Sequence, residues 1–376
     1  MSKSIKLSTF ITLVIFALTV TLCIAAEDTN KAKEQAKAEA MNKLLGRGVN
    51  LGNALEAPYE GAWGITLKEE YFQLIKDAGL NSVRLPVRWS GHASTEPPYT
   101  IDPKFLERID WAINSCLSRN LPIIVNMHHY TELYTDPNAH KERFMALWKQ
   151  IAEHYKDYPG TLLFEIYNEP DDALTPDMWN EWLKEALAVI RKTNPSRTIV
   201  IGSANDSWIT YLKLLELPEN DRNIIVTVHH YFPHEFTHQG APWMIKEKIL
   251  KSIEEMKFIG QEVPAGATGF DGDSNTWLGT KWTGTDAEKK AMTDIFDVGA
   301  AWGKEHNRPI NLGEFGSYRK ADMESRVRWT RFVADTAAER GMSLHYWDFC
   351  AEFGLYDPKT KSFHKELLEA VIPPKQ

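Results

Sequence analysis

The sequence predicts a (β/α)8 TIM barrel, in which eight parallel strands alternate with helices and close into a ring. Eight short apolar runs alternate with helical patterns over the last ~330 residues, which is typical of parallel strands joined by crossover helices. A doubly wound open sheet is the alternative, but no glycine-rich phosphate loop follows the first run. The predicted strands are Gly46 to Leu51, Ser82 to Val87, Ile123 to Met127, Leu162 to Tyr167, Thr198 to Ile201, Ile224 to Val228, Ile310 to Leu312 and Ser343 to Trp347.

Helix start signals lie between these runs. A side chain that caps the first turn, followed by glutamate three residues later or by proline at the first helical position, marks a helix N-terminus. The signals are the capping-box pairs Thr66 with Glu69 and Thr285 with Glu288, and the cap and proline pairs Asp102-Pro103 and Thr175-Pro176. The apolar residues from Phe105 to Cys116 recur on one side of a helical pattern, so that side is expected to face the strands.

Residues 1–26 are expected to be a secretory signal peptide, which would make the protein secreted, extracellular or periplasmic. Two lysines precede an apolar stretch from Leu7 to Ile24, and Ala25 and Ala26 follow it. A retained membrane anchor is the alternative, because the stretch is near the lower length that spans a bilayer. Lipidation at Cys23 is a further alternative, although Leu22 is large where a small residue is usual.

The rest of the chain is predicted to be one catalytic domain, residues 45–376, preceded by a solvated helix or spacer over residues 27–44 that is rich in Lys, Glu and Ala. A net charge of −8 and a pI near 5.9 argue against nucleic acid as a partner. Cys116 and Cys350 are the cysteines beyond the leader, and they indicate no disulfide framework.

Two glutamates at predicted strand ends point to the chemistry. The fourth run ends in Asn168, Glu169 and Pro170, and the seventh leads through Gly313 into Glu314. The carboxyl ends of barrel strands meet on one face, so these two carboxylates are expected to lie together, as glycoside hydrolysis requires. Arg84 near the end of the second strand is too costly to bury unpaired, and Glu314 is its expected partner.

Amide, imidazole and aromatic side chains accompany the glutamates at the other strand ends. They indicate a sugar site, because indole faces stack on pyranose rings and polar side chains bond to hydroxyls. They are Asn50, Asn53, Glu56, Arg84, Trp89, Asn126, His128, His129, Tyr130, His229, His230, Tyr231, His238, Trp243, Trp347 and Asp348. A metal-dependent hydrolase is an alternative because of the His128-His129 pair, although the first strand lacks a His-x-His. A non-catalytic sugar-binding barrel is the other alternative.

Four stretches resemble glycoside hydrolase family 5, and in particular its bacterial cellulase and mannanase branch: Gly46 to Glu56, Val83 to Trp89, Phe164 to Pro170 and Leu312 to Gly316. The resemblance implies a retaining (β/α)8 hydrolase without metal or cofactor, acting on β-linked polysaccharides. It implies that Glu169 is the acid/base and Glu314 the nucleophile. It also implies supporting roles for Arg84, His128, Asn168, His229 and Tyr231, and substrate contacts for Asn53, Glu56, His129, His238, Trp243 and Trp347.

The chain departs from that branch between about residues 245 and 277, an insertion after the sixth strand that is expected to project over the catalytic face. Its Asp271 to Asn275 run is interpreted as a turn. The resemblance leaves glucan and mannan preference open, because the two sugars differ only at the 2-hydroxyl. Asn205 to Ser207 is an N-glycosylation sequon.

Overall fold

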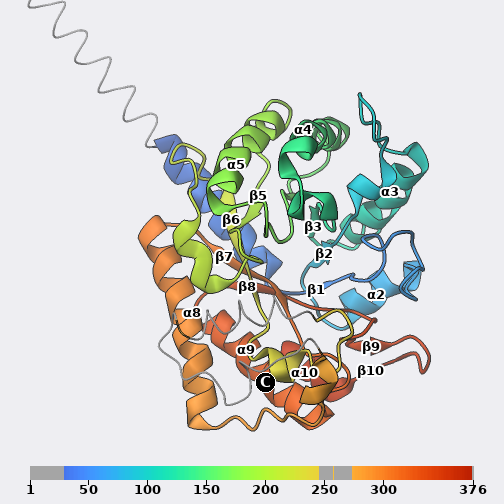
Figure 1. Ribbon diagram of the computed structural model, residues 1–376, viewed down its shortest axis with the longest axis vertical. Helices are drawn as coiled ribbons and strands as arrows, with labels where there is room; N and C mark the ends of the chain where they lie inside the picture. The colour runs from blue at the N-terminus through green and yellow to red at the C-terminus, as the bar shows by residue number, and fades with distance from the viewer. Residues whose placement is uncertain (1–28, 245–256, 258–272, 375–376) are drawn as a thin grey trace, which may run out of the picture.

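The described residues of the computed structural model, 29–244, 257 and 273–374, form a closed parallel barrel (Figure 1). The ring closes because the first strand pairs with both the second and the eighth. The strands are β1 (Arg47–Asn50), β2 (Val83–Leu85), β3 (Ile123–Asn126), β4 (Leu162–Glu165), β5 (Ile199–Gly202), β6 (Ile224–His230), β7 (Ile310–Phe315) and β8 (Ser343–Tyr346). The predicted barrel is therefore confirmed. β6 and β7 run further than predicted, so His229, His230 and Glu314 lie inside strands rather than after them.

Helices surround the strands in Figure 1. The α-helices are α2 (Glu69–Asp77), α3 (Pro103–Leu117), α4 (Pro137–His154), α5 (Pro176–Arg191), α6 (His234–Thr237), α8 (Asp286–His306), α9 (Met323–Glu339) and α10 (Lys365–Val371). The 3-10 helices are η1 (Trp89–His92), η2 (Thr131–Tyr134), η3 (Ile209–Leu214) and η5 (Ser274–Trp277). A short hairpin, β9 (Tyr356–Asp357) with β10 (Ser362–Phe363), follows β8.

Three of the four predicted helix starts are confirmed. Asp102 and Thr175 cap α3 and α5 ahead of their prolines, and Thr285 forms a complete capping box on α8. The predicted box of Thr66 with Glu69 is wrong, because α2 begins only at Glu69 after Lys68. The Glu69 carboxylate instead accepts a hydrogen bond from Arg119 at 2.5 Å, so it ties α2 to the end of α3.

The core lies between the strands and the helices. The predicted stripe of α3 is buried from Phe105 to Cys116, and Trp89 and Trp148 are fully buried, with each indole N–H bonded to a backbone carbonyl. These two tryptophans therefore belong to the core. Trp111 packs against the same core, and the guanidinium of Arg108 lies 3.8 Å from its ring centre.

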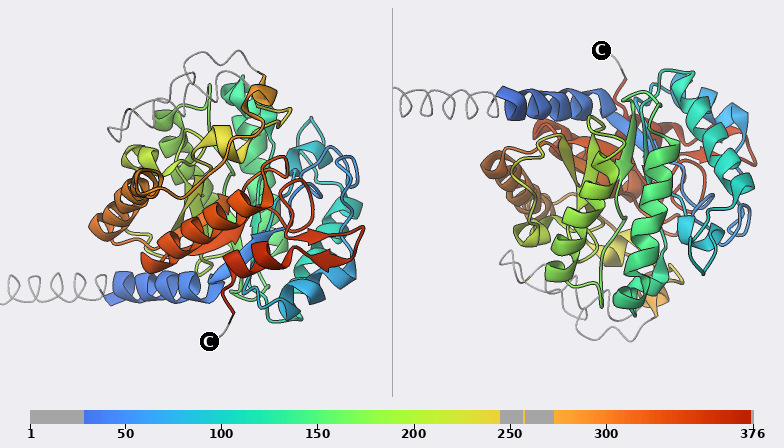
Figure 2. Two further views of the ribbon diagram at one scale, coloured as in Figure 1. Left: turned by 90° about the horizontal axis from the view of Figure 1, so that it is seen from below. Right: turned by 90° about the horizontal axis from the view of Figure 1, so that it is seen from above.

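Residues 29–45 form a helix that packs against the barrel interior. Its Ala38 and Leu45 are fully buried in a cluster with Ile124, Leu163, Val200 and Ile225, each the second residue of its strand. Figure 2 shows this helix, in blue, leading directly into the barrel. The helix expected here is present, but one side of it is buried rather than solvated. It therefore covers the amino end of the barrel, opposite the face where the strands end.

The predicted signal peptide and most of the predicted insertion lie outside the described residues. Among the residues that are described, no helix is both long enough and apolar enough to cross a bilayer. Of the insertion, Ser274 to Trp277 forms η5, and the Asp273 side chain caps it, in keeping with a turn there.

Two adjacent leucines test the role of the amino-terminal helix. Leu45 is fully buried, whereas Leu44 is 50% exposed. Leu45→Ala should lower the free energy of unfolding by about 2–5 kcal/mol, because it leaves a cavity under the strands. Leu44→Ala should change it by less than about 0.5 kcal/mol. Urea denaturation followed by circular dichroism measures both, and equal losses would mean that the helix does not pack on the barrel as described.

Candidate active site

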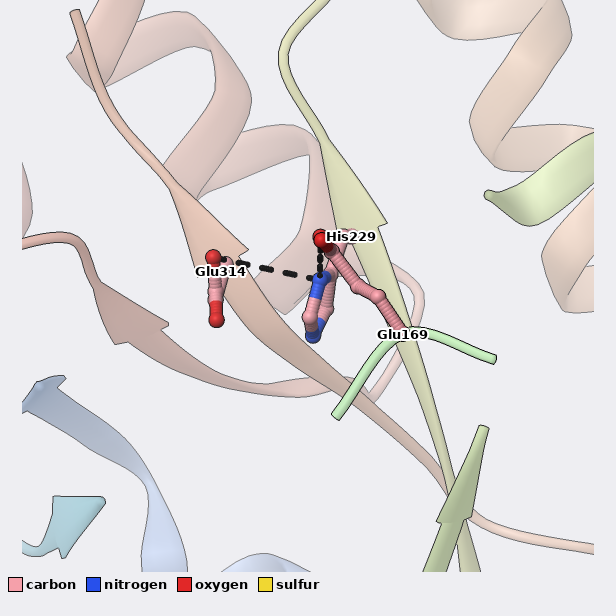
Figure 3. A group of neighbouring side chains, drawn as sticks. All are labelled: Glu169, His229 and Glu314. Atoms are coloured by element: carbon pink, nitrogen blue, oxygen red, sulfur yellow. Dashed lines mark hydrogen bonds and ion pairs between the residues drawn. The ribbon is translucent and has the colours of Figure 1, made fainter. Parts of the chain in front are cut away.

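The two predicted catalytic glutamates lie together at the carboxyl end of the barrel. Glu169 follows β4 and Glu314 lies in β7, with His229 of β6 between them (Figure 3). One ligand atom from each of the three residues lies within 4.8 Å of the others. Nδ1 of His229 is 2.7 Å from Glu169 Oε1 and 3.9 Å from Glu314 Oε2. The fold therefore brings two carboxylates from distant parts of the sequence to one point.

Arg84 of β2 is the cation of this site, and its side chain is completely buried. Its Nη1 donates to Glu314 Oε1 at 2.6 Å, which confirms the predicted pair. Its Nε and Nη2 donate to the two oxygens of Glu165 at 2.7 and 2.6 Å. The remaining donors reach Asn50 Oδ1 and Asn168 Oδ1. All five guanidinium N–H groups are thus used, which fixes the plane of Arg84.

Two glycines, Gly313 of β7 and Gly316 directly after β7, make room for this arrangement. A Cβ on Gly313 would lie 2.4 Å from Thr227 Oγ1, and one on Gly316 would lie 2.2 Å from the Trp347 carbonyl oxygen. The strand register shifts between Val228 and His229 on the neighbouring strand, which sets His229 opposite Glu314. The glycines on either side of Glu314 are therefore required by close packing against β6 and the end of β8.

Burial dominates the electrostatics of Glu314. Desolvation raises the pKa of its carboxyl above the ordinary value, the proximity of His229 and Arg84 opposes this rise, and Glu169 adds to it. The Tyr231 hydroxyl donates to Glu314 Oε2 at 2.9 Å, which further supports the ionised form. Arg84 and Tyr231 thus hold one oxygen each of the same carboxylate.

His229 is a neutral partner for Glu169. Burial lowers the pKa of its imidazole despite the nearby carboxylates. A neutral ring 2.7 Å from Glu169 Oε1 shares one proton with it, so that the proton lies either on Nδ1 or on the carboxyl. This contact gives Glu169 a place to receive and return a proton.

Asn168 and His128 are oriented by the same network. Asn168 Oδ1 accepts from Arg84, so its amide nitrogen points away from the guanidinium. The Asn126 amide nitrogen lies 3.1 Å from His128 Nδ1, so Nδ1 accepts and the ring proton lies on Nε2. The His128 ring stacks parallel to Trp347, with centroids 5.8 Å apart. The imidazole of His128, with its proton on Nε2, thus lies beside a tryptophan.

The comparisons with known proteins agree with this geometry. A family model described as Cellulase (glycosyl hydrolase family 5) matches residues 46–353. The chain belongs to this family. The predicted resemblance is therefore confirmed, and the match extends over nearly the whole barrel.

Relatives within family 5 include endoglucanases. Endoglucanase H of Acetivibrio thermocellus is 36% identical over 89% of this chain and 33% of its own length. Thermotoga maritima Cel5A, solved in complex with mannotriose, is 49% identical with a TM-score of 0.80, covering 89% of this chain and 99% of that one. Subunit Z of the cellulose synthase of Clostridioides difficile is 34% identical with a TM-score of 0.77, covering 87% of this chain and 99% of that one. The chain spans about a third of the length of the curated relatives it first matches.

The other predicted substrate contacts lie in the segments that follow β1, β3, β6 and β8. Trp347 packs on Gly52, where a Cβ would lie 2.9 Å from the indole. His129 adopts a left-handed φ of 50°, and its ring lies edge-on to His128. On the other side, the His238 ring packs on Tyr231, and Trp243 is 44% exposed. The half-buried Asn53 also has a left-handed φ, 63°, after β1.

Glu56, also predicted as a substrate contact, lies below the surface, and that role stays a prediction. It is completely buried, and its carboxyl accepts hydrogen bonds from the backbone N–H groups of Asn53 and Ala54. Burial raises the pKa of Glu56 to about 8 and that of Asp348 to about 7. The Asp348 carboxyl likewise accepts from backbone N–H groups, at Ala351 and Phe353. Glu56 therefore stabilises the loop after β1, which carries Asn53. Asp348 stabilises the loop after β8, which begins at Trp347.

Glu169, His229 and Glu314 are also the one group among the described residues whose ligand atoms lie close enough to hold a cation. The His128-His129 pair, predicted as a metal alternative, is not part of that group. Carboxylate and imidazole ligands would suit Zn²⁺. The roles predicted for these three residues in glycoside hydrolysis, and the absence of a metal requirement, both stay predictions.

Two residues of the site were not singled out in the sequence. Glu165 is a charged residue inside an apolar strand. Like Arg84, it is too costly to bury without a partner, and this signal could have identified it. Trp63 is 42% exposed and lies edge-on to His129, with centroids 5.4 Å apart. Nothing in the local sequence distinguishes Trp63 from a core tryptophan.

A turn with three successive left-handed residues supports the site from β5. Asn205, Asp206 and Ser207 have φ values of 61°, 55° and 57°. The Ser207 hydroxyl donates to the carbonyl of Asn168 at 3.0 Å, and the Ser207 carbonyl accepts from the backbone of His229. The turn therefore ties Asn168 to His229.

Tyr231→Phe tests the hydrogen bonding of Glu314. Loss of the hydroxyl removes a donor to the ionised carboxylate, so the pKa of Glu314 should rise by about half a unit to one unit. Titration of side-chain carboxyls by 13C NMR measures the shift. Tyr59→Phe, at a residue that is 67% exposed, is the control and should leave the pKa of Glu314 unchanged. An unchanged pKa in Tyr231→Phe would contradict the described contact.

Proposed function

We propose that this chain is a secreted endo-β-1,4-glucanase that hydrolyses internal bonds of cellulose, β-glucan and glucomannan with retention at the anomeric carbon. The observation that carries the proposal is the approach of Glu169 and Glu314 to within 4.8 Å, measured between single ligand atoms. Retaining glycosidases place their carboxyl groups about 5–5.5 Å apart, whereas inverting enzymes need about 6.5–9.5 Å for a water molecule. The endoglucanase relatives support the choice of glucan.

In the first step, Glu314 attacks the anomeric carbon and the bond to the leaving oxygen breaks. Glu169 gives its proton to that oxygen, so a neutral hydroxyl leaves and a glycosyl ester of Glu314 forms. Arg84 and Tyr231 orient the attacking carboxylate, one on each oxygen. The Asn168 amide, turned away from Arg84, is placed to donate to a sugar hydroxyl as charge develops at the ring.

In the second step, Glu169 takes a proton from water, and the resulting hydroxide attacks the same carbon and releases Glu314. The 2.7 Å contact with His229 supports this change of role, because a neutral imidazole can accept or return the shared proton. Trp347, stacked on His128, supplies a flat apolar face for the sugar at the reacting bond.

Glu314→Gln should abolish turnover of carboxymethyl cellulose, because an amide cannot form the glycosyl ester. Binding of a cello-oligosaccharide should remain measurable by calorimetry, since the amide keeps the shape of the side chain. Glu185→Gln, on the outer helix α5 and paired with Lys141, is the matched control and should keep full activity. Turnover retained in Glu314→Gln would exclude Glu314 as the nucleophile.

A mannanase or dual-specificity enzyme is the second candidate, because the 49% identical Thermotoga maritima Cel5A was solved in complex with mannotriose. Glucose and mannose differ at the 2-hydroxyl, so the preference depends on whether the neighbourhood of Asn53, His128 and His129 accepts an axial group there. A metal-dependent hydrolase and a sugar-binding barrel remain further alternatives.

One assay panel distinguishes the candidates. We expect reducing-sugar release from carboxymethyl cellulose, barley glucan and glucomannan, unaffected by EDTA, with the β-anomer appearing first by proton NMR. Release from galactomannan alone would indicate a mannanase, and loss of activity with EDTA would indicate a metal enzyme. The α-anomer as first product would contradict retention, and no release from any substrate would favour the sugar-binding barrel.

A further inference from the structure

We propose that Glu165 is a positioning residue for the nucleophile: it shares the charge of Arg84 with Glu314 and remains its partner when Glu314 becomes an ester. The inference deepens the proposed double displacement and depends on it. It concerns a residue that touches no substrate and acts through Arg84.

The contacts of Glu165 place it directly behind Arg84. Both of its oxygens accept from the guanidinium, at 2.6 and 2.7 Å, and both side chains are completely buried. The strand register fixes the positions of both residues in the barrel. Arg84 of β2 lies opposite Asn50 of β1, and Glu165 of β4 lies opposite Asn126 of β3. The Asn126 amide also donates to Glu165 Oε1 at 3.4 Å. Glu165 therefore cannot turn away from Arg84 without leaving buried donors unpaired.

Charge accounting shows why a second carboxylate is useful. In the resting site, one guanidinium faces two carboxylates. After attack, the new bond joins the anomeric carbon to a Glu314 oxygen, the proton of Glu169 has left with the departing hydroxyl, and Glu314 is a neutral ester. The negative charge has then moved to Glu169, which contacts His229. Without Glu165, Arg84 would therefore be a buried cation without a hydrogen-bonded counterion, which is strongly unfavourable. With Glu165, the pair stays neutral throughout the cycle.

The same sharing keeps Glu314 reactive. A carboxylate paired with an undivided guanidinium is more stabilised as an anion, and so is a weaker nucleophile. Glu165 takes two of the five donors of Arg84 and leaves one for Glu314. Arg84 thus orients the nucleophile without fully neutralising it.

Several titratable groups surround Glu314 and its partner Arg84. Arg84, Glu169 after β4, His229 of β6 and Tyr231 directly after β6 act on Glu314 itself, whereas Glu165 of β4 and His128 after β3 act on Arg84. A change at Glu165 leaves all of the others in place.

Glu165→Gln separates charge sharing from simple support. If Glu165 shares the charge of Arg84, its removal leaves Glu314 with a stronger cation, so the pKa of Glu314 falls. The acidic limb of kcat/KM on a soluble cello-oligosaccharide should then move to lower pH by about one unit. If Glu165 merely holds Arg84 in place, its loss weakens the Arg84 contact, and the limb should move to higher pH. An acidic limb of the kcat/KM profile that stays at the wild-type pH, or that moves to higher pH, would overturn the proposal.

Two further variants complete the experiment. Glu165→Asp keeps the charge but shortens the side chain, so we expect a limb at the wild-type position with kcat lowered by up to about 100-fold. An upward shift in this variant would also overturn the proposal, even if Glu165→Gln failed to fold. Asp221→Asn breaks an equally bidentate pair with Arg191, before β6 at the other end of the barrel, and should leave the profile unchanged.

Failure of the proposed function gives a different result. A folded wild-type protein that hydrolyses no glucan would contradict the double displacement itself. The pKa of Glu314 can still be followed in that protein by 13C NMR, where the downward shift in Glu165→Gln tests the charge sharing without turnover.

Discussion

The structure of the active site depends on one buried cation. A guanidinium removed from water is tolerated only when its charge is balanced and all of its N–H groups are bonded. Arg84 meets both conditions by contacting side chains from β1, β4 and β7 and the segment after β4. Any shift of these elements relative to one another would break a buried contact. The contacts that balance the charge and satisfy the N–H groups of buried Arg84 therefore also fix the carboxylate of Glu314.

The barrel interior changes in character from one end to the other. Near the amino end, the cluster that includes Leu45 is apolar and is covered by the helix of residues 29–45. Further along, Asn311 bonds to Ser343 and His345, which forms a neutral polar layer. The charged layer around Arg84 follows at the carboxyl end. Charge is thus confined to the end where chemistry is proposed, and the apolar end supplies stability.

The barrel and its glutamate pair could be predicted because each rests on a local pattern. Apolar runs ended in glutamate, and parallel strands place such ends on one face. The burial of Glu56 could not be predicted, because it comes from a turn that folds back over the side chain and presents N–H groups two and three residues away. The start of α2 was missed because Glu69 bonds to Arg119, which lies in the turn after α3. At α2, a tertiary contact outweighed the local signal.

The turn at residues 205–207 has a consequence for how the protein is produced. It carries an N-glycosylation sequon, yet the hydroxyl of Ser207 is fully buried and bonded beneath Asn168. An oligosaccharide transferase could therefore read the sequon only on a chain that has not yet folded, and a glycan attached at that stage would compete with closure of the turn. A bacterial or cell-free expression system avoids this competition, whereas a yeast secretory host would introduce it next to the active site.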